Sequence, residues 1–301
     1  MSDLIVSAVQ NYGWPKLRAY ANSLARCGFE GTKLMFVENV AQDCQENLRS
    51  LGFDVRPFST KGLPSARRGQ KLAFCNARYI PVIEFLKQND FRYVIWTDTR
   101  DLVFQSNPSD WLDAHGAPLV AAGECWSIKG LPPSPNDTWV KYVATPEDYA
   151  WIREQEALCS GTIAGDTQTV LALMERMLDV SYAVDQVWGI DQGVYNCVVR
   201  QSPFKEVLRV PRMAEGFIAT CSAFRTDSFA SGVATLSLLI DEQPRFDRKN
   251  GVVRAPRTDA EFCIFHQYDR DDIWAVLIEA KYVGEAGEVR VDQGILPSVQ
   301  R

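Results

Sequence analysis

Apolar runs alternate with amphipathic stretches through the first hundred residues. The runs predict buried strands at residues 4–9, 33–37, 53–57 and 91–97. The stretches between them predict helices that open at Trp14-Pro15, cover residues 41–51 and cover residues 68–87, the last kinked at Pro81. Strands that alternate with helices usually form parallel sheets with crossover connections. This part of the chain therefore predicts a doubly wound α/β sheet.

The pattern becomes less regular after residue 105. A Pro-rich stretch at residues 131–135 precedes a strong amphipathic helix that begins at Asp166, and short strands and turns follow. We predict a single α/β domain over residues 1–301, built on a mixed, mostly parallel central sheet flanked by helices. It has a regular half at residues 1–105 and an irregular half at residues 106–301.

Composition narrows the classes of function. The chain has 32 Lys plus Arg against 38 Asp plus Glu, a formal net charge of −6, and 46% hydrophobic residues. This is an ordinary globular composition, and it lacks the clustered positive charge that nucleic-acid binding needs. No window approaches the roughly 18 apolar residues of a membrane span, and the N-terminus has no basic leader, so we expect a soluble, cytoplasmic protein. An anionic substrate would need local help from a metal ion or a few arginines.

The eight cysteines are scattered and form no CxxC pair. Neither a zinc ribbon nor a small disulfide scaffold is indicated by this spacing. We expect reduced thiols that are mostly buried.

Two carboxylates follow the fourth predicted strand, in the segment Trp96-Thr97-Asp98-Thr99-Arg100-Asp101. Ligands of open α/β sheets bind beyond the carboxyl ends of the strands. A turn after Asp98 would bring Asp98 and Asp101 to one side, where two carboxylates suit a hard divalent cation. Alternatively, Asp98 caps a turn and Asp101 is solvated.

Three later segments add candidate chemistry. Residues 157–165 are small and lead into the helix at Asp166, either as a close approach to a ligand or as a plain turn. Asp191 and Gln192 open an apolar stretch, either as site residues or as a helix-capping pair. His266 follows the apolar run 262–265, where it is either a third metal ligand or a structural histidine.

In their order along the chain, these segments resemble the metal-dependent glycosyltransferases of the GT-A fold, most closely glycosyltransferase family 8. That family has an Arg on the helix before an acidic strand end, a small-residue turn, a DQ motif and a late His. The counterparts here are Arg78, Asp98 with Asp101, Cys159-Ser160-Gly161, Asp191-Gln192 and His266. The match spans roughly residues 4–270. The shared order is more specific than any single motif.

The sequence departs from the family pattern at three places. Arg100 occupies the usual second position of the DxD motif, so either a longer turn brings Asp101 to the metal or Arg100 replaces part of its charge. We favour Asp101. Cys159 stands where the family has Asn, and Arg270 stands near the place of a family Lys that reaches the diphosphate.

The resemblance implies transfer of a sugar from a nucleoside diphosphate sugar, with UDP the expected nucleotide, to a hydroxyl of a glycan or other acceptor. It implies that Asp98, Asp101 and His266 hold Mn²⁺ or Mg²⁺. Arg78, Ser160, Gly161 and Arg270 would bind the donor in a nucleotide-binding half at residues 1–105 and a sugar-binding half at residues 106–301. Asp191 and Gln192 would lie beside the donor sugar as catalytic residues, and the family keeps the anomeric configuration. Trp126, Trp139 and Trp151 are candidate platforms for an acceptor sugar, although packing explains them equally well.

Two other classes fit some of the same residues. Haloacid-dehalogenase-like phosphatases and phosphotransferases also place an aspartate after a buried strand, but they need a second aspartate two residues later, and position 100 is Arg. A non-catalytic module that binds a nucleotide sugar or a glycan would keep the pocket without turnover.

Overall fold

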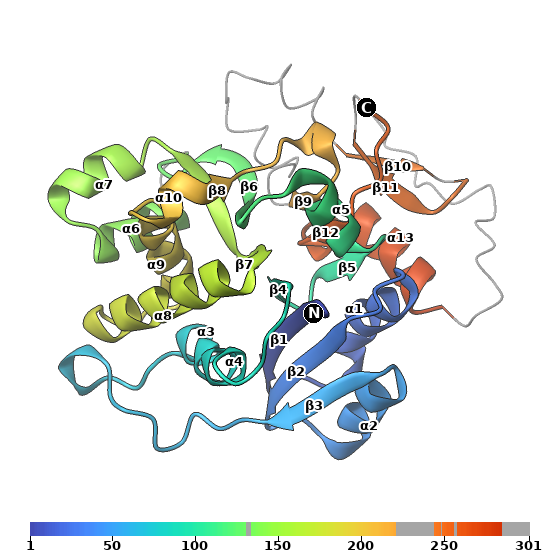
Figure 1. The fold of residues 1–301 in the computed structure, drawn as a ribbon, viewed down its shortest axis with the longest axis horizontal. Coiled ribbons are helices and arrows are strands. Elements are labelled where there is room, and N and C mark those ends of the chain that lie inside the picture. The colour runs from blue at the N-terminus through green and yellow to red at the C-terminus, as the bar shows by residue number, and fades with distance from the viewer. Residues whose placement is uncertain (131–133, 221–243, 248, 256–257, 285–301) are drawn as a thin grey trace.

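The computed structural model describes residues 1–130, 134–220, 244–247, 249–255 and 258–284 (Figure 1). Its first part follows the predicted alternation closely. The elements are β1 (Leu4–Gln10), α1 (Trp14–Arg26), β2 (Thr32–Glu38), α2 (Gln42–Ser50) and β3 (Phe53–Pro57). Pro15 stands in the first turn of α1, where its missing N–H costs nothing.

The predicted helix at residues 68–87 is wrong in its first third. The helical segment consists of α3 (Phe74–Ala77) and α4 (Tyr79–Leu86), which precede β4 (Tyr93–Thr97). Arg68 and Gly69 have positive φ angles of 57° and 72°, which no α-helix accommodates, so the chain cannot be helical there. The two helices are separated at Arg78, and Pro81 in the first turn of α4 has no N–H to donate to the Ala77 carbonyl.

The central sheet has seven strands in the order β3-β2-β1-β4-β7-β6-β8. Its later strands are β6 (Leu119–Ser127), β7 (Glu156–Asp166) and β8 (Leu208–Arg209). The pairs β2–β3, β1–β2, β1–β4 and β6–β8 are parallel, whereas β7 runs antiparallel to both of its neighbours. The prediction of a mixed, mostly parallel α/β sheet flanked by helices is confirmed. The 157–165 stretch is a long strand rather than a turn.

Helices cover both faces of this sheet (Figure 1). On one face α1, α2 and α5 (Pro108–His115) bury Leu17, Leu48 and Leu112 against the strands. On the other face α4, α8 (Thr167–Ala183) and α9 (Ile190–Val198) form a second apolar layer. The predicted amphipathic helix is α8, which Asp166 caps by accepting a hydrogen bond from the Thr169 N–H at 2.8 Å.

A three-stranded sheet, β5-β12-β9, brings the segment after Asp101 next to the segment that contains His266. It consists of β5 (Leu102–Phe104), β9 (Ile218–Thr220) and β12 (Ile264–His266). β5 begins directly after Asp101, and β12 runs antiparallel to it with His266 opposite Leu102. This register places His266 beside the turn that carries the two aspartates.

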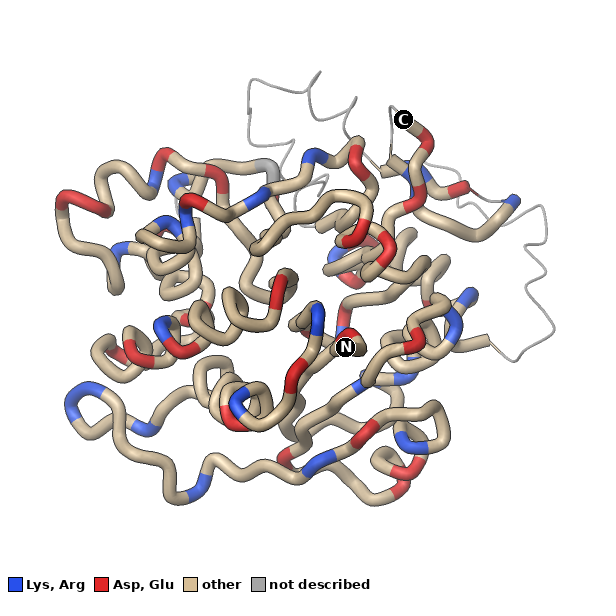
Figure 2. The backbone as a smooth tube through the Cα atoms, viewed as in Figure 1, with Lys and Arg blue, Asp and Glu red and all other residues tan. Residues whose placement is uncertain are grey.

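The remaining elements lie around this framework. They are α6 (Pro135–Val143), α7 (Pro146–Ile152), α10 (Phe204–Val207), β10 (Arg245–Asp247), β11 (Val252–Arg254) and α13 (Asp272–Tyr282), with 3-10 turns at Arg67–Gly69, Met213–Glu215 and Tyr268–Arg270. Within the described ranges, no helix combines the length and apolarity that a membrane crossing requires. Lys and Arg are interleaved with Asp and Glu along the backbone (Figure 2).

The cysteine prediction is confirmed for the side chains that the structure describes. Cys27, Cys44, Cys75, Cys159, Cys197 and Cys263 are free thiols, and all but Cys75 are buried. The side chains of Cys125 and Cys221 lie outside the described part of the chain.

A candidate active site at the carboxyl end of β4

Asp98, Asp101 and His266 meet at the carboxyl end of β4. The Nε2 atom of His266 lies 3.5 Å from Oδ1 of Asp101 and 3.9 Å from Oδ2 of Asp98. His266 and Asp101 are buried, whereas a third of the Asp98 side chain is exposed. The turn after Asp98 thus brings both carboxylates to the same imidazole.

Arg78 joins this group to α9. Its Nη1 donates to Oδ1 of Asp98 at 2.6 Å, and its Nη2 donates to Oδ2 of Asp191 at 3.1 Å. Burial alone would lower the pKa of Arg78, but Asp98, Tyr79 and Asp191 raise it well above its usual value. Burial raises the pKa of Asp191, and Arg78 opposes that rise. The guanidinium therefore holds two carboxylates from different elements in one place.

Asp191 and Gln192 lie in the first turn of α9, which has Gly189 as its N-cap. Neither caps the helix. The Ser160 N–H donates to Oε1 of Gln192 at 2.7 Å, and the Ser160 hydroxyl donates to Oδ2 of Asp191 at 3.4 Å. Both side chains are buried, and both face β7.

Gly161 allows β7 to pass close to the aspartates. A Cβ at this position would lie 2.5 Å from Oδ2 of Asp98 and 2.6 Å from Cε1 of His266. The Gly161 carbonyl also accepts a hydrogen bond from the Asp98 N–H at 2.7 Å. Only a residue without a side chain fits here as the site is arranged.

Two arginines reach Asp101 from the solvent side. Nη2 of Arg100 lies 3.2 Å from Oδ2 of Asp101, and Nη2 of Arg270 lies 3.8 Å from the same atom. Burial would raise the pKa of Asp101, but the hydrogen bond from His266 and the charges of His266, Arg100 and Arg270 lower it well below its usual range. Asp101 faces His266, and Arg100 packs on the exposed side of the turn and also pairs with Asp269.

Glu124 lies at the site although the sequence did not mark it, and Cys159, noted in the sequence only as a departure from the family pattern, lies beside His266. Nε2 of Gln192 donates to Oε1 of Glu124 at 3.4 Å. Burial raises the pKa of the Glu124 carboxyl. Sγ of Cys159 lies 3.6 Å from Nδ1 of His266, on the side of the ring away from the aspartates. No local signal marks Glu124, because it lies in an irregular strand with a register shift.

The site contains carboxylate oxygens and an imidazole nitrogen, which are ligand atoms of divalent cations, but they are not arranged as a metal centre. Among the residues that the structure describes, no three His, Cys, Asp or Glu side chains are grouped as a metal centre. With metal–ligand bonds of about 2.1 Å, two ligands of one octahedral ion lie about 3.0 Å apart when cis and about 4.2 Å apart when trans. The 3.5 and 3.9 Å separations from His266 to Asp101 and Asp98 match neither value, so the side chains would have to shift to hold one ion. Two carboxylates and an imidazole fit Mn²⁺ or Mg²⁺ in their chemistry.

The predicted tryptophans are separated by the fold. Trp126 is half-buried and packs against the apolar cluster around Phe265. Trp151 is 53% exposed near the end of α7. Trp139 lies on α6, where it contacts the N-terminal turn of α9.

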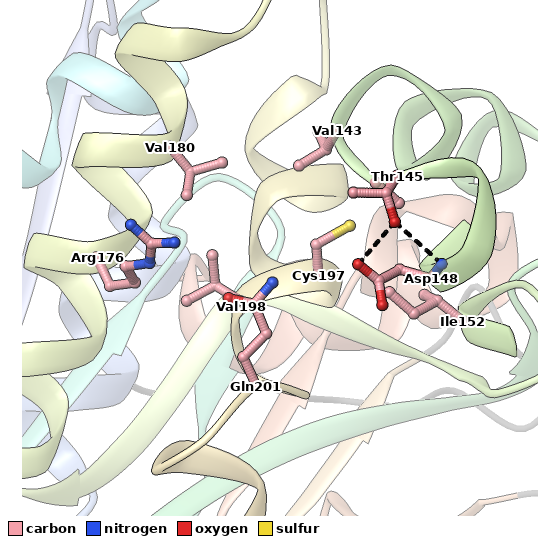
Figure 3. A pocket seen from close by; sticks show the side chains of 10 residues that line it. Val143, Thr145, Asp148, Ile152, Arg176, Val180, Cys197, Val198 and Gln201 are labelled. Carbon is pink, nitrogen blue, oxygen red and sulfur yellow. Dashed lines mark hydrogen bonds between the residues drawn. The ribbon is translucent and has the colours of Figure 1, made fainter.

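A separate pocket lies between α6, α7, α8 and α9 (Figure 3). Its walls include Asp148, Arg176, Cys197 and Gln201, and Thr145 Oγ1 donates to Asp148 Oδ2 within it at 2.9 Å. Cys197 lies near the C-terminal end of α9, five residues beyond Gln192. The N-terminal turn of α9 therefore contributes Asp191 and Gln192 to the candidate active site, and its C-terminal end lines this separate pocket.

No protein-family model matches the sequence, and no curated protein matches it. Among solved structures, the chain is similar to core-mannan synthase A from Aspergillus fumigatus in its Mn/GDP form. The TM-score is 0.44 at 10% sequence identity, and the match covers 70% of this chain and 73% of the synthase chain. A likeness of this size assigns no family, and no residue role is transferred from it.

Proposed function

We propose that this chain is a divalent-metal-dependent glycosyltransferase that takes its sugar from a nucleoside diphosphate sugar. One observation carries the proposal. The short motifs behind the family resemblance are scattered between residues 78 and 266, yet Arg78, Asp98, Ser160, Asp191 and His266 are linked by contacts of 2.6–3.9 Å. This gathering of the motifs supports the proposal, because the resemblance expects these same residues to form one site.

Asp98, Asp101 and His266 would hold the cation, which when bound neutralises negative charge on the leaving diphosphate. Cys159 sits at Nδ1 of His266, so Nε2 is the ring nitrogen that faces the carboxylates. Fixing the far side of an imidazole in this way sets the direction of its ligand lone pair.

The chain's own cations complete the donor site. Arg270 has 40% of its side chain exposed and lies at the edge of the aspartate pair, so its guanidinium can grip a phosphate with two N–H groups. Arg78 is occupied by Asp98 and Asp191 and acts mainly by positioning both. Gly161 lets β7 pass close to Asp98 and His266, and the neighbouring Ser160 hydroxyl offers a polar contact to the donor.

Gln192 is placed to contact the transferred sugar. Its carbonyl oxygen accepts from the Ser160 N–H, and one amide N–H points to Glu124, so a second N–H is left for a sugar hydroxyl. An amide is a poor nucleophile. We therefore favour a front-face displacement in which the departing phosphate guides the acceptor hydroxyl, with retention at the anomeric carbon and a UDP-sugar as donor.

The test combines binding with turnover. UDP and GDP should raise the melting temperature only when Mn²⁺ or Mg²⁺ is present, because a ligand that binds the folded state stabilises it. A panel of UDP- and GDP-sugars with Mn²⁺ should then reveal slow donor hydrolysis or transfer. The Asp98→Ala, Asp101→Ala double variant should lose the metal-dependent shift. An unchanged shift would show that these residues do not hold the cation.

His266→Ala gives the matching single-site test. It should weaken Mn²⁺-dependent nucleotide binding while the protein still unfolds cooperatively. Wild-type metal affinity in this variant would remove His266 from the ligand set. Binding of nucleotides without any hydrolysis or transfer across the panel would indicate a non-catalytic binding module.

A further inference from the structure

Trp188 is exposed to a degree that is unusual for tryptophan. It is 85% exposed, whereas tryptophan is on average highly buried because its large apolar ring is costly to hydrate. The ring is not isolated. It meets the ring of Trp139 edge to face, with centroids 5.5 Å apart and an interplanar angle of 62°.

Two glycines at the start of α9, the N-cap Gly189 and Gly193, allow Trp139 to pack closely against the helix. A Cβ on Gly189 would lie 2.3 Å from Cζ2 of Trp139, and a Cβ on Gly193 would lie 2.6 Å from the Trp139 carbonyl carbon. Gly189 also has a positive φ of 75°, which glycine adopts without strain. The close approach of α6 to α9 therefore fixes the Trp139 ring, and Trp188 rests on it.

The loop that carries Trp188 is tied down by hydrogen bonds. The Gln186 N–H donates to Oε1 of Gln70 at 2.8 Å, and its Nε2 donates to the Ser181 carbonyl at 2.6 Å. Its Oε1 accepts from Nδ2 of Asn76 at 3.1 Å. A platform held on such a loop loses little conformational freedom when a ligand binds.

The same helix pair links the platform to the candidate active site. Asn136 and Trp139 are three residues apart on α6 and therefore share a face, about 4.5 Å apart along the axis. Nδ2 of Asn136 donates to Oε2 of Glu124 at 3.2 Å, and Glu124 in turn accepts from Gln192. Gln192 directly precedes Gly193, which contacts Trp139. Trp188 directly precedes Gly189, the N-cap of α9, so it stands four residues, about one helical turn, before the amide that would contact the transferred sugar.

We propose that Trp188, backed by Trp139, is the stacking platform of an acceptor subsite for a hexopyranose residue of a glycan. The inference rests on the proposed function and specifies its acceptor class. A pyranose has an apolar C–H face, which matches the exposed indole face of Trp188, and a rim of hydroxyls that stays hydrated when the ring stacks. The one-turn spacing is comparable to the size of one sugar ring, so a residue stacked on Trp188 would direct a hydroxyl toward a donor sugar at Gln192.

The experiment measures glycan binding directly. An array of hexose-terminated oligosaccharides is probed with the wild type, and the best binder is titrated against Trp188→Ala, Trp188→Phe and Ile273→Ala by tryptophan fluorescence and by calorimetry. Trp188→Ala should weaken binding at least tenfold, and Trp188→Phe, which keeps a flat ring, should retain most of it. Ile273→Ala removes an exposed apolar side chain from α13 and should leave the affinity within about twofold. Because Trp188 is exposed, its removal should not unfold the chain, and thermal unfolding of each variant checks this.

Each other outcome contradicts the proposal. No binding by the wild type, equal binding by Trp188→Ala, or an equal loss in Ile273→Ala would each overturn the subsite. Quenching by UDP or GDP alone that disappears in Trp188→Ala would assign the platform to the nucleobase instead. The proposed function is judged separately, by metal-dependent nucleotide binding and donor hydrolysis in the wild type. Glycan binding without either would contradict the transferase and leave a glycan-binding module.

Discussion

Replacing Gly161 with Ala tests the site geometry with a single methyl group. The added Cβ would lie 2.5 Å from Oδ2 of Asp98 and 2.6 Å from Cε1 of His266. Ordinary contact begins near 3.4 Å, so about 0.9 Å of separation must be gained on the Asp98 side. Asp98 is held by Arg78 at 2.6 Å and His266 is buried, so neither side chain can move without losing a partner. The backbone of Gly161 does not have a positive φ, so the methyl group is the only source of conflict.

We expect this displacement to act mainly on function. A misplacement of about 1 Å at a reacting centre costs on the order of 100-fold in rate, whereas overpacking at a buried position costs about 1–3 kcal/mol of stability. Gly161→Ala should therefore fold, lose most of the Mn²⁺-dependent melting-temperature shift with UDP or GDP, and hydrolyse its donor about 100-fold more slowly. Gly13→Ala is the matched control, because the nearest atom to its Cβ is a proline carbon at 3.7 Å.

The refuting result is specific. If Gly161→Ala keeps the wild-type metal-dependent shift and the wild-type hydrolysis rate, then the donor and cation do not bind where Asp98 and His266 face β7. If Gly13→Ala loses activity to the same extent, then the loss reflects general destabilisation and the geometric reasoning fails.

Three further perturbations address stability. Arg78→Ala should lower the free energy of unfolding by about 3–5 kcal/mol in urea titrations, because it leaves the buried Asp191 carboxylate without its cation. Arg56→Ala breaks an exposed ion pair and should cost under about 1 kcal/mol. Equal effects of the two variants would contradict this reasoning. Gly193→Ala should destabilise by about 1–3 kcal/mol despite the better helix propensity of Ala, because its Cβ meets the Trp139 backbone, and a gain in thermal stability would refute the packing. Burial alone would raise the pKa of Asp3, but hydrogen bonds from Arg92 outweigh this effect. The net pKa is therefore below the ordinary 3.8. Asp3→Asn should therefore cost about 1 kcal/mol at pH 7 and progressively less as the pH falls below about 4, and a melting-temperature gap that stays constant from pH 7 to pH 3 would exclude this linkage.

The regular half of the fold could be predicted because its signals are local. Strands rich in apolar residues and helices with one apolar face are visible in the sequence, and β1 through β3 lie where the pattern places them. The turn after Asp98 was also predictable, since strand ends in open α/β sheets carry ligand-binding residues. The failure at residues 68–73 has a local cause as well. Positive φ angles at Arg68 and Gly69 end the helical pattern, and nothing in the residue type of Arg68 announces them.

The rest of the site depends on contacts between distant segments. Glu124 is recognised as part of the site only because Gln192 from α9 and Asn136 from α6 donate hydrogen bonds to it. Cys159 is a departure from the family pattern in the sequence, and only the pairing of β12 with β5 reveals that its thiol faces His266. The sequence does not mark Trp188, because exposure is a property of the folded surface and its sequence neighbours give no sign of it.

The charges at the site explain why binding of an anionic donor should require a metal ion. The carboxylates at and around the turn are already matched by guanidinium groups in close contact: Asp98, Asp101, Asp191 and Asp269 with Arg78, Arg100 and Arg270. The three guanidiniums and the His266 imidazolium, which lowers the pKa of Asp101, balance these four carboxylates, in a chain whose formal net charge is −6 with histidine counted as neutral. A diphosphate therefore meets no uncompensated positive charge unless a cation arrives with it or before it. The metal dependence of nucleotide binding follows from this balance, and metal-independent binding of UDP or GDP would show that the arginines are free to leave their carboxylates.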